Sequence, residues 1–479
     1  MKTRSFWFSA AAALIIAAMV AGCGTTTFFA GRQLPPSGLP TRVLIAIQNP
    51  SALTKGSLEI VDAFYDTRYK FNNQTVTFSI SGFAGALPVS IQNMPEEQTG
   101  AVYGSGDGSL TPVGYGKEAS AGAVKGLVGP SSSIFITRSQ TWVIAAQQAA
   151  HVLTIINQVT GATVALGLPG IYRVSVNPGG STALAFVQNS NYVYYPRQLT
   201  PTQTISYSGG PSTWPLGAVD CEPLNAPTWC LLQALDPSST AGKLVPLTFD
   251  RPIKAVFSQD GGTAYILNCG PECGGAAASV SQLPVAPTIF LTNQQSGTLP
   301  TQAALTASTI PVPGGASNAL VTGSTMYVAG QKLMPDGLFT GNLTVLNLAN
   351  NTAGNPTSIS DGTPGGVSRM LLGDDNTLWI GMTKCNNGER FATGQPYGCL
   401  TMYNTASNSV TLLEPYLGDA TGIANVEGYH KVYVAQGGQV YIFSTKDGSS
   451  INNQYVTVTG TAWDVAFIDS TTDANNTVY

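Results

Sequence analysis

The chain contains two histidines, His151 and His430, and any serine-hydrolase triad would have to use one of them. The Gly-x-Ser-x-Gly elbow that marks the commonest serine hydrolases does not occur in the sequence. His151 lies in an Ala-His-Val-Leu-Thr segment typical of a strand, and His430 lies in a turn-like Gly-Tyr-His-Lys segment. The sequence therefore gives neither histidine a catalytic role and assigns no catalytic residue elsewhere.

Motifs for metal and phosphate are also missing from the sequence. A calcium loop needs carboxylates at alternate positions, and the acidic segment 373–377 has the wrong spacing. A glycine-rich phosphate-binding loop needs a lysine and a helix directly after it. Neither follows the glycine-rich segment 104–108, so this segment indicates a hairpin turn. The net charge is −4 and the chain past its leader has no basic run, so we expect no nucleic acid partner. We also expect no metal and no cofactor.

Six of the seven cysteines fall into close pairs along the sequence. An even number of cysteines in an exported chain indicates disulfides, although the sequence alone does not fix their connectivity. Zinc at Cys269 and Cys273 would need two further ligands nearby, and both histidines are distant in the sequence. We expect disulfides between near neighbours, with metal as the alternative. The expected pairs are Cys221 with Cys230, Cys269 with Cys273, and Cys385 with Cys399.

The seventh cysteine ends an apolar leader in the order Val20-Ala21-Gly22-Cys23, the pattern that a bacterial lipoprotein signal peptidase reads. Residues 1–22 have a charged start and a short apolar stretch, as a signal peptide does, and are expected to be removed. Cys23 would then be acylated, and residues 23–41 would form a flexible tether. An ordinary secretory signal is the alternative. Glycine at position 24, in place of aspartate, favours the outer membrane over the inner membrane.

Beyond the tether, short runs rich in Val, Ile, Tyr, Phe and Thr alternate with turn residues, and no long stretch keeps a helical period. The segments 175–184 and 257–265 each show a strand, a Gly-Gly turn and a second strand, and their turns are 82 residues apart. That separation is twice about 41 residues, the length of a propeller blade. The sequence therefore predicts an all-β fold, a single β-propeller of four-stranded antiparallel blades.

Three repeats, Tyr327-Val-Ala, Tyr433-Val-Ala and Asn177-Pro-Gly-Gly, resemble those of the YVTN and lactonase-like group of bacterial β-propellers. In that group a Tyr-Val-Ala strand is followed by a strand with a Thr-Gly turn, and then by Pro-Asp-Gly before the next blade. The resemblance covers most of the body and is clearest near residues 130–190, 250–270 and 315–460. It implies the same fold, but it transfers no catalytic residue, because no motif of the chain matches a catalytic set.

The two ends of the body are expected to close the ring together. Residues 461–467 resemble an innermost strand with no successor, and residues 41–48 resemble a second strand with no predecessor. Joined, they would complete one blade and remove the exposed sheet edges. We expect seven blades over residues 42–470, with eight as the alternative, and a tail at 471–479. The segment 229–232 would be a decorated hairpin and not a blade.

Aromatic and basic residues near position 195 are candidates for a binding surface. Aromatic rings beside an arginine suit a protein partner or a sugar ring, and the alternative is packing between blades. Long segments at 195–230, 283–312 and 383–399 are the expected recognition loops, because function varies in the loops of a regular ring. The candidate surface residues are Tyr192, Tyr194, Tyr195, Arg197, Trp214 and Trp229.

The sequence thus favours a monomeric envelope lipoprotein that is not an enzyme and that binds an envelope protein as a scaffold. The propeller lipoprotein of the outer-membrane assembly machinery is a precedent for such a role. Contact with the membrane would be made through the lipid at Cys23. The alternative is a lactonase-like hydrolase or a sugar-binding propeller, which the resemblance implies only by analogy.

Overall fold

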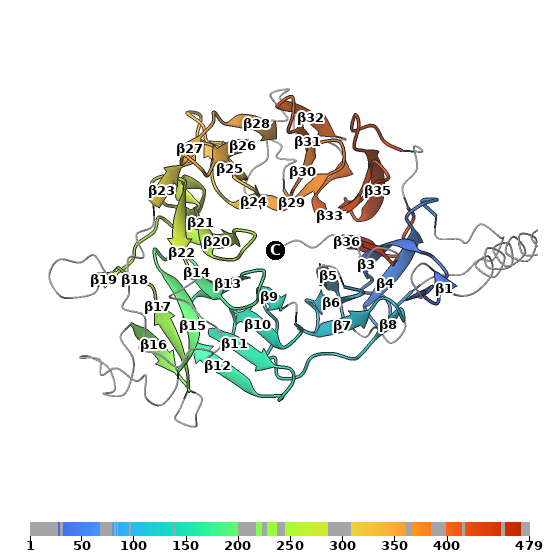
Figure 1. Cartoon of the computed structure of the whole chain (residues 1–479), viewed down its shortest axis with the longest axis horizontal. Coiled ribbons are helices and arrows are strands. Elements are labelled where there is room, and N and C mark those ends of the chain that lie inside the picture. Colours follow the sequence, from blue (N-terminus) through green and yellow to red (C-terminus); the bar gives the residue numbers. More distant parts are fainter. Residues whose placement is uncertain are drawn as a thin grey trace, which may run out of the picture.

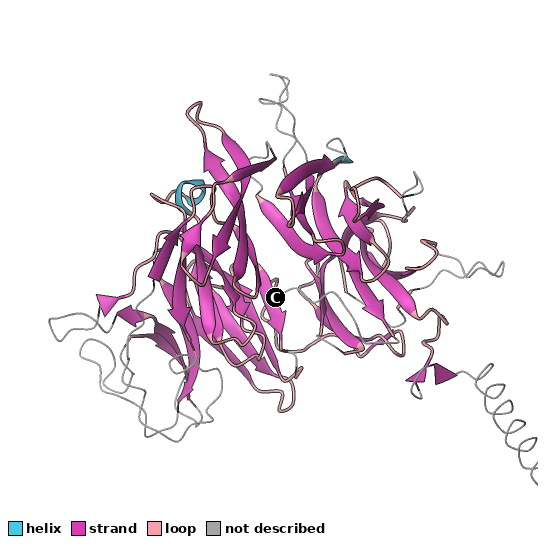
Figure 2. Cartoon of the chain, turned by 45° about the horizontal axis from the view of Figure 1, so that its top comes forward, coloured by secondary structure: helices cyan, strands magenta, loops and turns pink. Residues whose placement is uncertain are grey.

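Small antiparallel sheets form a ring around a common centre (Figure 1). Eight such sheets are found among the described residues, so the fold is an all-β propeller with eight blades. Strands account for nearly all of its regular structure (Figure 2). The structure is a computed structural model that describes residues 27–28, 32–67, 79–80, 83, 85–94, 97–137, 139–199, 217–222, 228–236, 245–285, 308–360, 366–384, 399–413, 417–451 and 456–470.

The first strand of each blade lies nearest the centre of the ring (Figure 1). These first strands are β5 (Pro88–Asn93), β9 (Ser133–Ile136), β13 (Ile171–Val176), β20 (Pro252–Phe257), β24 (Asn318–Thr322), β29 (Val367–Gly373), β33 (Ala420–Val426) and β36 (Thr461–Asp469).

The remaining strands lie farther out, and seven of the eight blades draw all their strands from one continuous stretch of chain. They are β6 (Thr99–Gly104), β7 (Leu110–Gly114) and β8 (Ala119–Ser120); β10 (Trp142–Gln147), β11 (Val152–Asn157) and β12 (Thr163–Gly167); β14 (Ala183–Val187), β15 (Val193–Leu199), β16 (Ala218–Cys221) and β17 (Thr228–Gln233); β21 (Thr263–Asn268), β22 (Ser279–Pro284) and β23 (Ser308–Pro311); β25 (Thr325–Leu333), β26 (Phe339–Asn347), β27 (Thr352–Ala353) and β28 (Thr357–Ser360); β30 (Thr377–Met382), β31 (Leu400–Asn404) and β32 (Ser409–Leu413); and β34 (Lys431–Gln436) and β35 (Gln439–Ser444). They follow in chain order except that β17 lies inside β16 and that β27 and β28 both pair with β26.

The closing blade combines both ends of the chain, as the sequence predicts. Its order is β36, β3 (Thr41–Gln48) and β4 (Gly56–Asp62), so the first strand comes from the end of the described chain. Strand β3 pairs with β36 along its whole length, from Thr41 opposite Asp469 to Gln48 opposite Thr461. Two short pairs lie outside the blades: β1 (Thr27–Phe28) with β2 (Arg32–Gln33), and β18 (Leu235–Asp236) with β19 (Val245–Pro246).

The structure has eight blades, the alternative that the sequence left open, and not the preferred seven. The interpretation of the 82-residue repeat as two blades is also wrong. The two Gly-Gly turns belong to the consecutive first strands β13 and β20, so the spacing spans one blade and not two. The extra length is an insertion, because β15 pairs with β17 and the hairpin of β17 and β16 forms the outer edge of the same blade. That hairpin is a decoration, as expected. The segment 87–128 holds a complete blade with weak sequence signals, β5 to β8.

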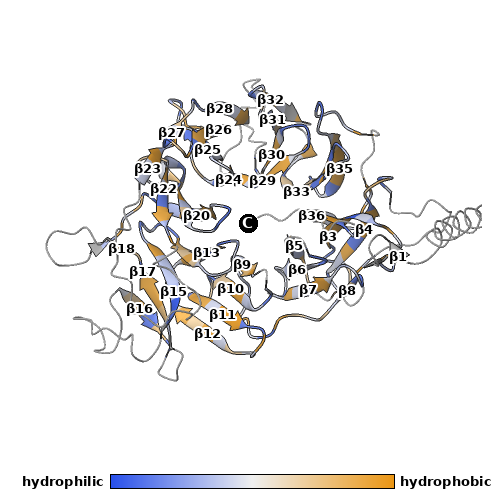
Figure 3. Ribbon diagram, in the orientation of Figure 1, coloured by the Kyte–Doolittle hydropathy of each residue, from blue (hydrophilic) through white to orange (hydrophobic). Residues whose placement is uncertain are grey.

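Apolar side chains between neighbouring blades form the core, and the alternation of each strand divides them between the two sides. In β10, Val143 packs toward the preceding blade with Tyr103, whereas Ile144 packs toward the following blade with Val174. Each blade therefore needs both neighbours to bury its two faces. Hydropathy colouring shows this pattern, with apolar residues along the strands and polar residues concentrated in the turns (Figure 3). Among the described residues, no helix is long and apolar enough to cross a bilayer.

Asp464 of β36 joins the first strands at the seam of the ring. Its carboxylate accepts a hydrogen bond from the backbone N–H of Ile91 in β5 at 2.8 Å and pairs with Arg369 of β29 at 2.6 Å. Strand β33 lies between β29 and β36, and its Gly422 leaves room for this contact. A Cβ at Gly422 would lie 2.6 Å from both the Cα and the Oδ1 of Asp464.

Gly422→Ala should therefore push β33 away from β36 and lower the free energy of unfolding by about 1–3 kcal/mol, the usual cost of overpacking. Gly116→Ala is a matched control, because Gly116 is exposed and no heavy atom lies within 4 Å of the added Cβ. Urea unfolding of both variants measures the difference. Equal midpoints for Gly422→Ala and Gly116→Ala would show that the seam does not depend on this close approach.

Candidate functional site

A cavity of about 890 Å³ occupies the centre of the ring. All eight first strands contribute to its wall, from Ser90 of β5 round to Asp464 of β36. Ligand pockets of about 300–1,000 Å³ are typical of small-molecule sites. The central channel is therefore the natural candidate site, and its chemistry depends on which residues the first strands place there.

A shared backbone irregularity decides which side chains occupy equivalent positions in the channel. In six blades the pairing of the first and second strands skips one residue, as in a β-bulge, and the next residue resumes the pairing. The skipped residue bends the first strand locally. The residue that follows it therefore occupies an equivalent position in each of the six blades. These residues are Ser90, Arg173, Lys254, Arg369, Gly422 and Asp464.

We call Arg173, Lys254 and Arg369 the basic belt; all three line the channel. Arg369 is the member with an acidic partner, Asp464. The Nζ of Lys254 donates a hydrogen bond to Oδ1 of Asn318 in β24 at 2.8 Å. Arg173 lies over the ring of Tyr172, 5.6 Å from its centroid, and makes no ion pair among the described residues. The belt therefore carries more positive charge than the carboxylate beside it can balance.

Burial and like charges lower the pKa of Lys254 to about 7. Desolvation of the ammonium is the main cause, followed by repulsion from Arg173 and from Arg369. Asp464 shifts in the opposite sense, because its burial raises its pKa more than Arg369 and two backbone N–H groups lower it. Burial in the channel thus disfavours the charged forms of both Lys254 and Asp464.

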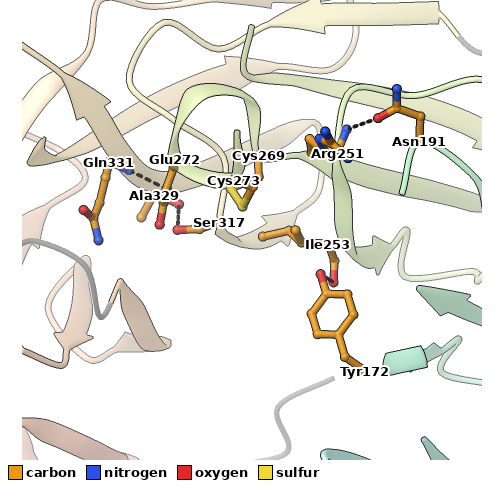
Figure 4. The surroundings of a disulfide bond; sticks show 10 residues. All are labelled: Tyr172, Asn191, Arg251, Ile253, Cys269, Glu272, Cys273, Ser317, Ala329 and Gln331. Atoms are coloured by element: carbon orange, nitrogen blue, oxygen red, sulfur yellow. Dashed lines mark hydrogen bonds between the residues drawn. A yellow bond between two sulfur atoms is a disulfide. The ribbon is translucent and has the colours of Figure 1, made fainter. Parts of the chain in front are cut away.

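A disulfide-closed turn places an acid on the wall of the channel. Cys269 and Cys273 are bonded across the short helical turn η2 (Gly270–Cys273), which carries Glu272 (Figure 4). The Glu272 carboxylate accepts a hydrogen bond from the backbone N–H of Gln331 in the next blade at 3.0 Å. Burial is the main cause that raises the pKa of Glu272 to about 7. Of the residues that the structure describes, Arg251 is the fourth cation on the channel wall, and its guanidinium donates to the carbonyl oxygen of Asn189.

The structure does not bring the predicted aromatic surface together on the exterior. Tyr195, Arg197 and Trp229 are buried, and the Trp229 ring meets Trp142 of the preceding blade edge to face at 5.5 Å. The reason is that β15 and β17 pair within a blade, so their side chains pack between blades. This is the alternative that the sequence left open. Tyr192 and Tyr194 are half-buried, and Trp214 lies outside the described residues.

Two of the three expected disulfides are present, Cys221 with Cys230 and Cys269 with Cys273. Cys399 is also disulfide-bonded, and its expected partner Cys385 lies outside the described residues. Cys23, the expected lipidation site, lies outside them too. No group of three or more possible metal-ligating side chains occurs in the described part of the chain.

Both histidines are exposed turn residues away from the channel. His151 has a positive φ of 57° and precedes β11, so the expectation that it sits within a strand is wrong. The Nδ1 of His430 lies 2.9 Å from an Asp375 carboxylate oxygen on the surface. The basic belt was missed in the sequence. A usable signal does exist, because each member is the third residue of its first strand, but that signal needs the blade boundaries.

No family model matches the chain, and no curated protein matches it. Among solved structures, it is similar to a dihydro-heme d1 dehydrogenase at 9% identity, with a TM-score of 0.51, over 92% of this chain and 79% of that one. A periplasmic gluconolactonase of Pseudomonas aeruginosa matches at 16% identity with a TM-score of 0.41, covering 89% of this chain and 98% of that one. A Bacteroides fragilis protein described as a 6-phosphogluconolactonase matches at 10% identity with a TM-score of 0.43, covering 90% and 98%. At 9% identity, the likeness to the dehydrogenase shows a shared fold alone.

Lys254→Met should stabilise the fold in a pH-dependent way. The folded-state pKa of about 7 lies below the unfolded value of 10.5, so the charged lysine destabilises the fold fully below pH 7. That penalty shrinks as the pH rises from 7 toward 10.5. Asn318 keeps a partner in the variant, because its Oδ1 also accepts from the N–H of Ala319.

Thermal unfolding across this pH range measures the effect. We expect Lys254→Met to unfold at a higher temperature than the wild type at about pH 6, with the gap closing by about pH 10. Lys332→Met removes the same charge from an exposed position outside the channel and serves as the control. A gap that does not change with pH would contradict a depressed pKa at Lys254.

Proposed function

We propose that this protein is a ligand-binding β-propeller of the cell envelope, which takes a small polar molecule into its central channel. The observation that carries the proposal is the channel itself. It has a volume of about 890 Å³, and every blade supplies part of its wall. Its charged side chains come from several different first strands, so a bound molecule would contact the ring as a whole.

The channel supports a small ligand more directly than it supports a scaffold role. The aromatic surface expected for a protein partner is largely packed between blades, with Tyr195 and Trp229 buried. Binding also suits the channel better than hydrolysis does. The Asp464 carboxylate is already occupied by the N–H of Ile91, the N–H of Val465 and Arg369, so it is a structural tie and not a free base.

The disulfides support the proposed compartment. The bonds Cys221–Cys230 and Cys269–Cys273 need an oxidising environment, which supports an extracytoplasmic location. We therefore propose that the leader directs export, that Cys23 carries the lipid, and that the propeller stands at the outer membrane on its tether. The protein would then sample small molecules that enter the envelope.

A side chain that fills the channel tests the binding role. Ser90→Trp places an indole on the channel wall, whereas Ser51→Trp adds the same ring to an exposed turn. Thermal shift against neutral sugars, sugar acids and phosphorylated sugars should reveal at least one class that stabilises the wild type and Ser51→Trp, but not Ser90→Trp. If no class does so, and crosslinking in cells captures one envelope protein with all three forms, the scaffold role replaces this proposal.

The anchor is tested by Cys23→Ser. Loss of the thiol removes the site of acylation, so the variant should move from the membrane fraction to the soluble envelope fraction. Fractionation followed by immunoblotting, with mass analysis of the N-terminal peptide, measures the change. Ser5→Cys in the same leader leaves Cys23 in place and serves as a control. A Cys23→Ser protein that stays acylated and membrane-bound would refute lipidation at this residue.

A further inference from the structure

The basic belt places three cations on the inner wall of the ring from three different blades. Arg173 comes from β13, Lys254 from β20 and Arg369 from β29, each at the position after the skipped residue. The ammonium of Lys254 lies close enough to both guanidinium groups for their charges to destabilise it. The three groups therefore share one region of the channel.

The charges around the belt do not balance. Among the described residues that line the channel, the cations are the belt and Arg251, and the acids are Glu272 and Asp464. Asp464 is bound to Arg369, and Glu272 accepts a hydrogen bond from the N–H of Gln331. Arg173 and Lys254 face the channel with neutral partners only, Tyr172 and Asn318. This excess is local, because the chain as a whole has a net charge of −4.

We infer that the basic belt is an oxyanion site, which holds a carboxylate or phosphate group of the channel ligand between Arg173 and Lys254. The inference rests on the proposed function and gives the ligand its chemistry. Arginine offers two parallel N–H donors that match a carboxylate or a phosphate, and lysine adds a compact charge. Arg369, fixed by Asp464, closes the third side of the site.

Asp464 has a positioning role in this site. Its carboxylate accepts a hydrogen bond from Nη2 of Arg369 at 2.6 Å, and it also accepts hydrogen bonds from the N–H groups of Ile91 and Val465. Gly422 leaves the path between the two side chains open. The guanidinium of Arg369 is thus oriented before a ligand arrives, which reduces the entropy lost on binding.

Binding should be linked to protons. Lys254 faces Arg173 from β13, Arg369 from β29 and Asn318 from β24, and an anion among them would favour its charged form. The protein should take up a proton on binding near pH 7, and affinity should fall as the pH rises above 7. Burial also raises the pKa of Glu272 on the channel wall to about 7, so Glu272→Gln separates its contribution from that of Lys254.

Isothermal titration calorimetry of the full chain tests the site with three probes: inorganic phosphate, succinate and glucose. We expect phosphate or succinate to bind the wild type more tightly than glucose does. Arg173→Gln and Lys254→Gln should weaken that binding by roughly 10- to 100-fold, as the loss of a charged hydrogen bond does. Lys332→Gln removes an exposed charge outside the channel and should leave the affinity unchanged. Stronger binding of phosphate or of succinate identifies which oxyanion the site prefers.

A second set of measurements keeps the test independent of folding. Arg173→Lys keeps the positive charge but loses the paired N–H donors of the guanidinium, so it should bind the anion with intermediate affinity. The unfolding temperature of each variant without ligand shows whether it is folded. Titrations in two buffers of different ionisation enthalpy should show proton uptake that Lys254→Gln abolishes and Glu272→Gln retains. The inference is overturned if neither anion binds, or if Lys332→Gln weakens binding as much as Arg173→Gln. Glucose binding that Ser90→Trp blocks, without anion binding, would overturn the oxyanion site and leave the proposed function standing.

Discussion

Asp464 holds together the part of the ring that the chain cannot hold by continuity. Seven blades draw all their strands from one stretch of sequence, but the closing blade must join β36 to β3 across the whole length of the chain. The pairing of those strands supplies the backbone hydrogen bonds, and the Asp464 carboxylate extends the connection to β5 and β29. Because each blade buries its faces only against its neighbours, a loose seam would expose apolar surface on both sides.

The same geometry that closes the ring also creates the channel chemistry. Apolar side chains fill most of the space between blades, whereas the inner edges of the first strands line the channel with polar and charged groups. The repeated skip in strand pairing gives those groups equivalent positions in different blades. Different residue types occupy this position, such as Asp464, Gly422 and Arg369. One position therefore serves two purposes: it ties neighbouring strands in one part of the ring and lines the channel with charge in another.

The sequence predicted the features that depend on local patterns. Tyr-Val-Ala strands, Gly-Gly turns and closely spaced cysteines specify hairpins and short disulfides, and the unmatched strands at the two ends specify the closure. The preferred blade count was one too low because the blade within residues 87–128 has weak sequence signals. The 82-residue spacing was misinterpreted because the insertion between β15 and β17 has the length of a further blade. Tyr195 and Trp229 were ambiguous, because an aromatic strand residue looks the same in sequence whether it faces solvent or a neighbouring blade. The basic belt could not be found, because Arg173, Lys254 and Arg369 meet only through the register of separate blades.

The belt also explains why a ligand should matter to the ring itself. A cation enclosed by other cations destabilises the fold, and the depressed pKa of Lys254 is the measure of that destabilisation. An anion between Arg173 and Lys254 would remove the repulsion and bridge the neighbouring strands β13 and β20 on the channel wall. Ligand that binds only the folded chain adds its binding free energy to stability. A propeller held by contacts between neighbouring blades would then gain a further link between two of them, so channel occupancy and the cohesion of these blades would rise together.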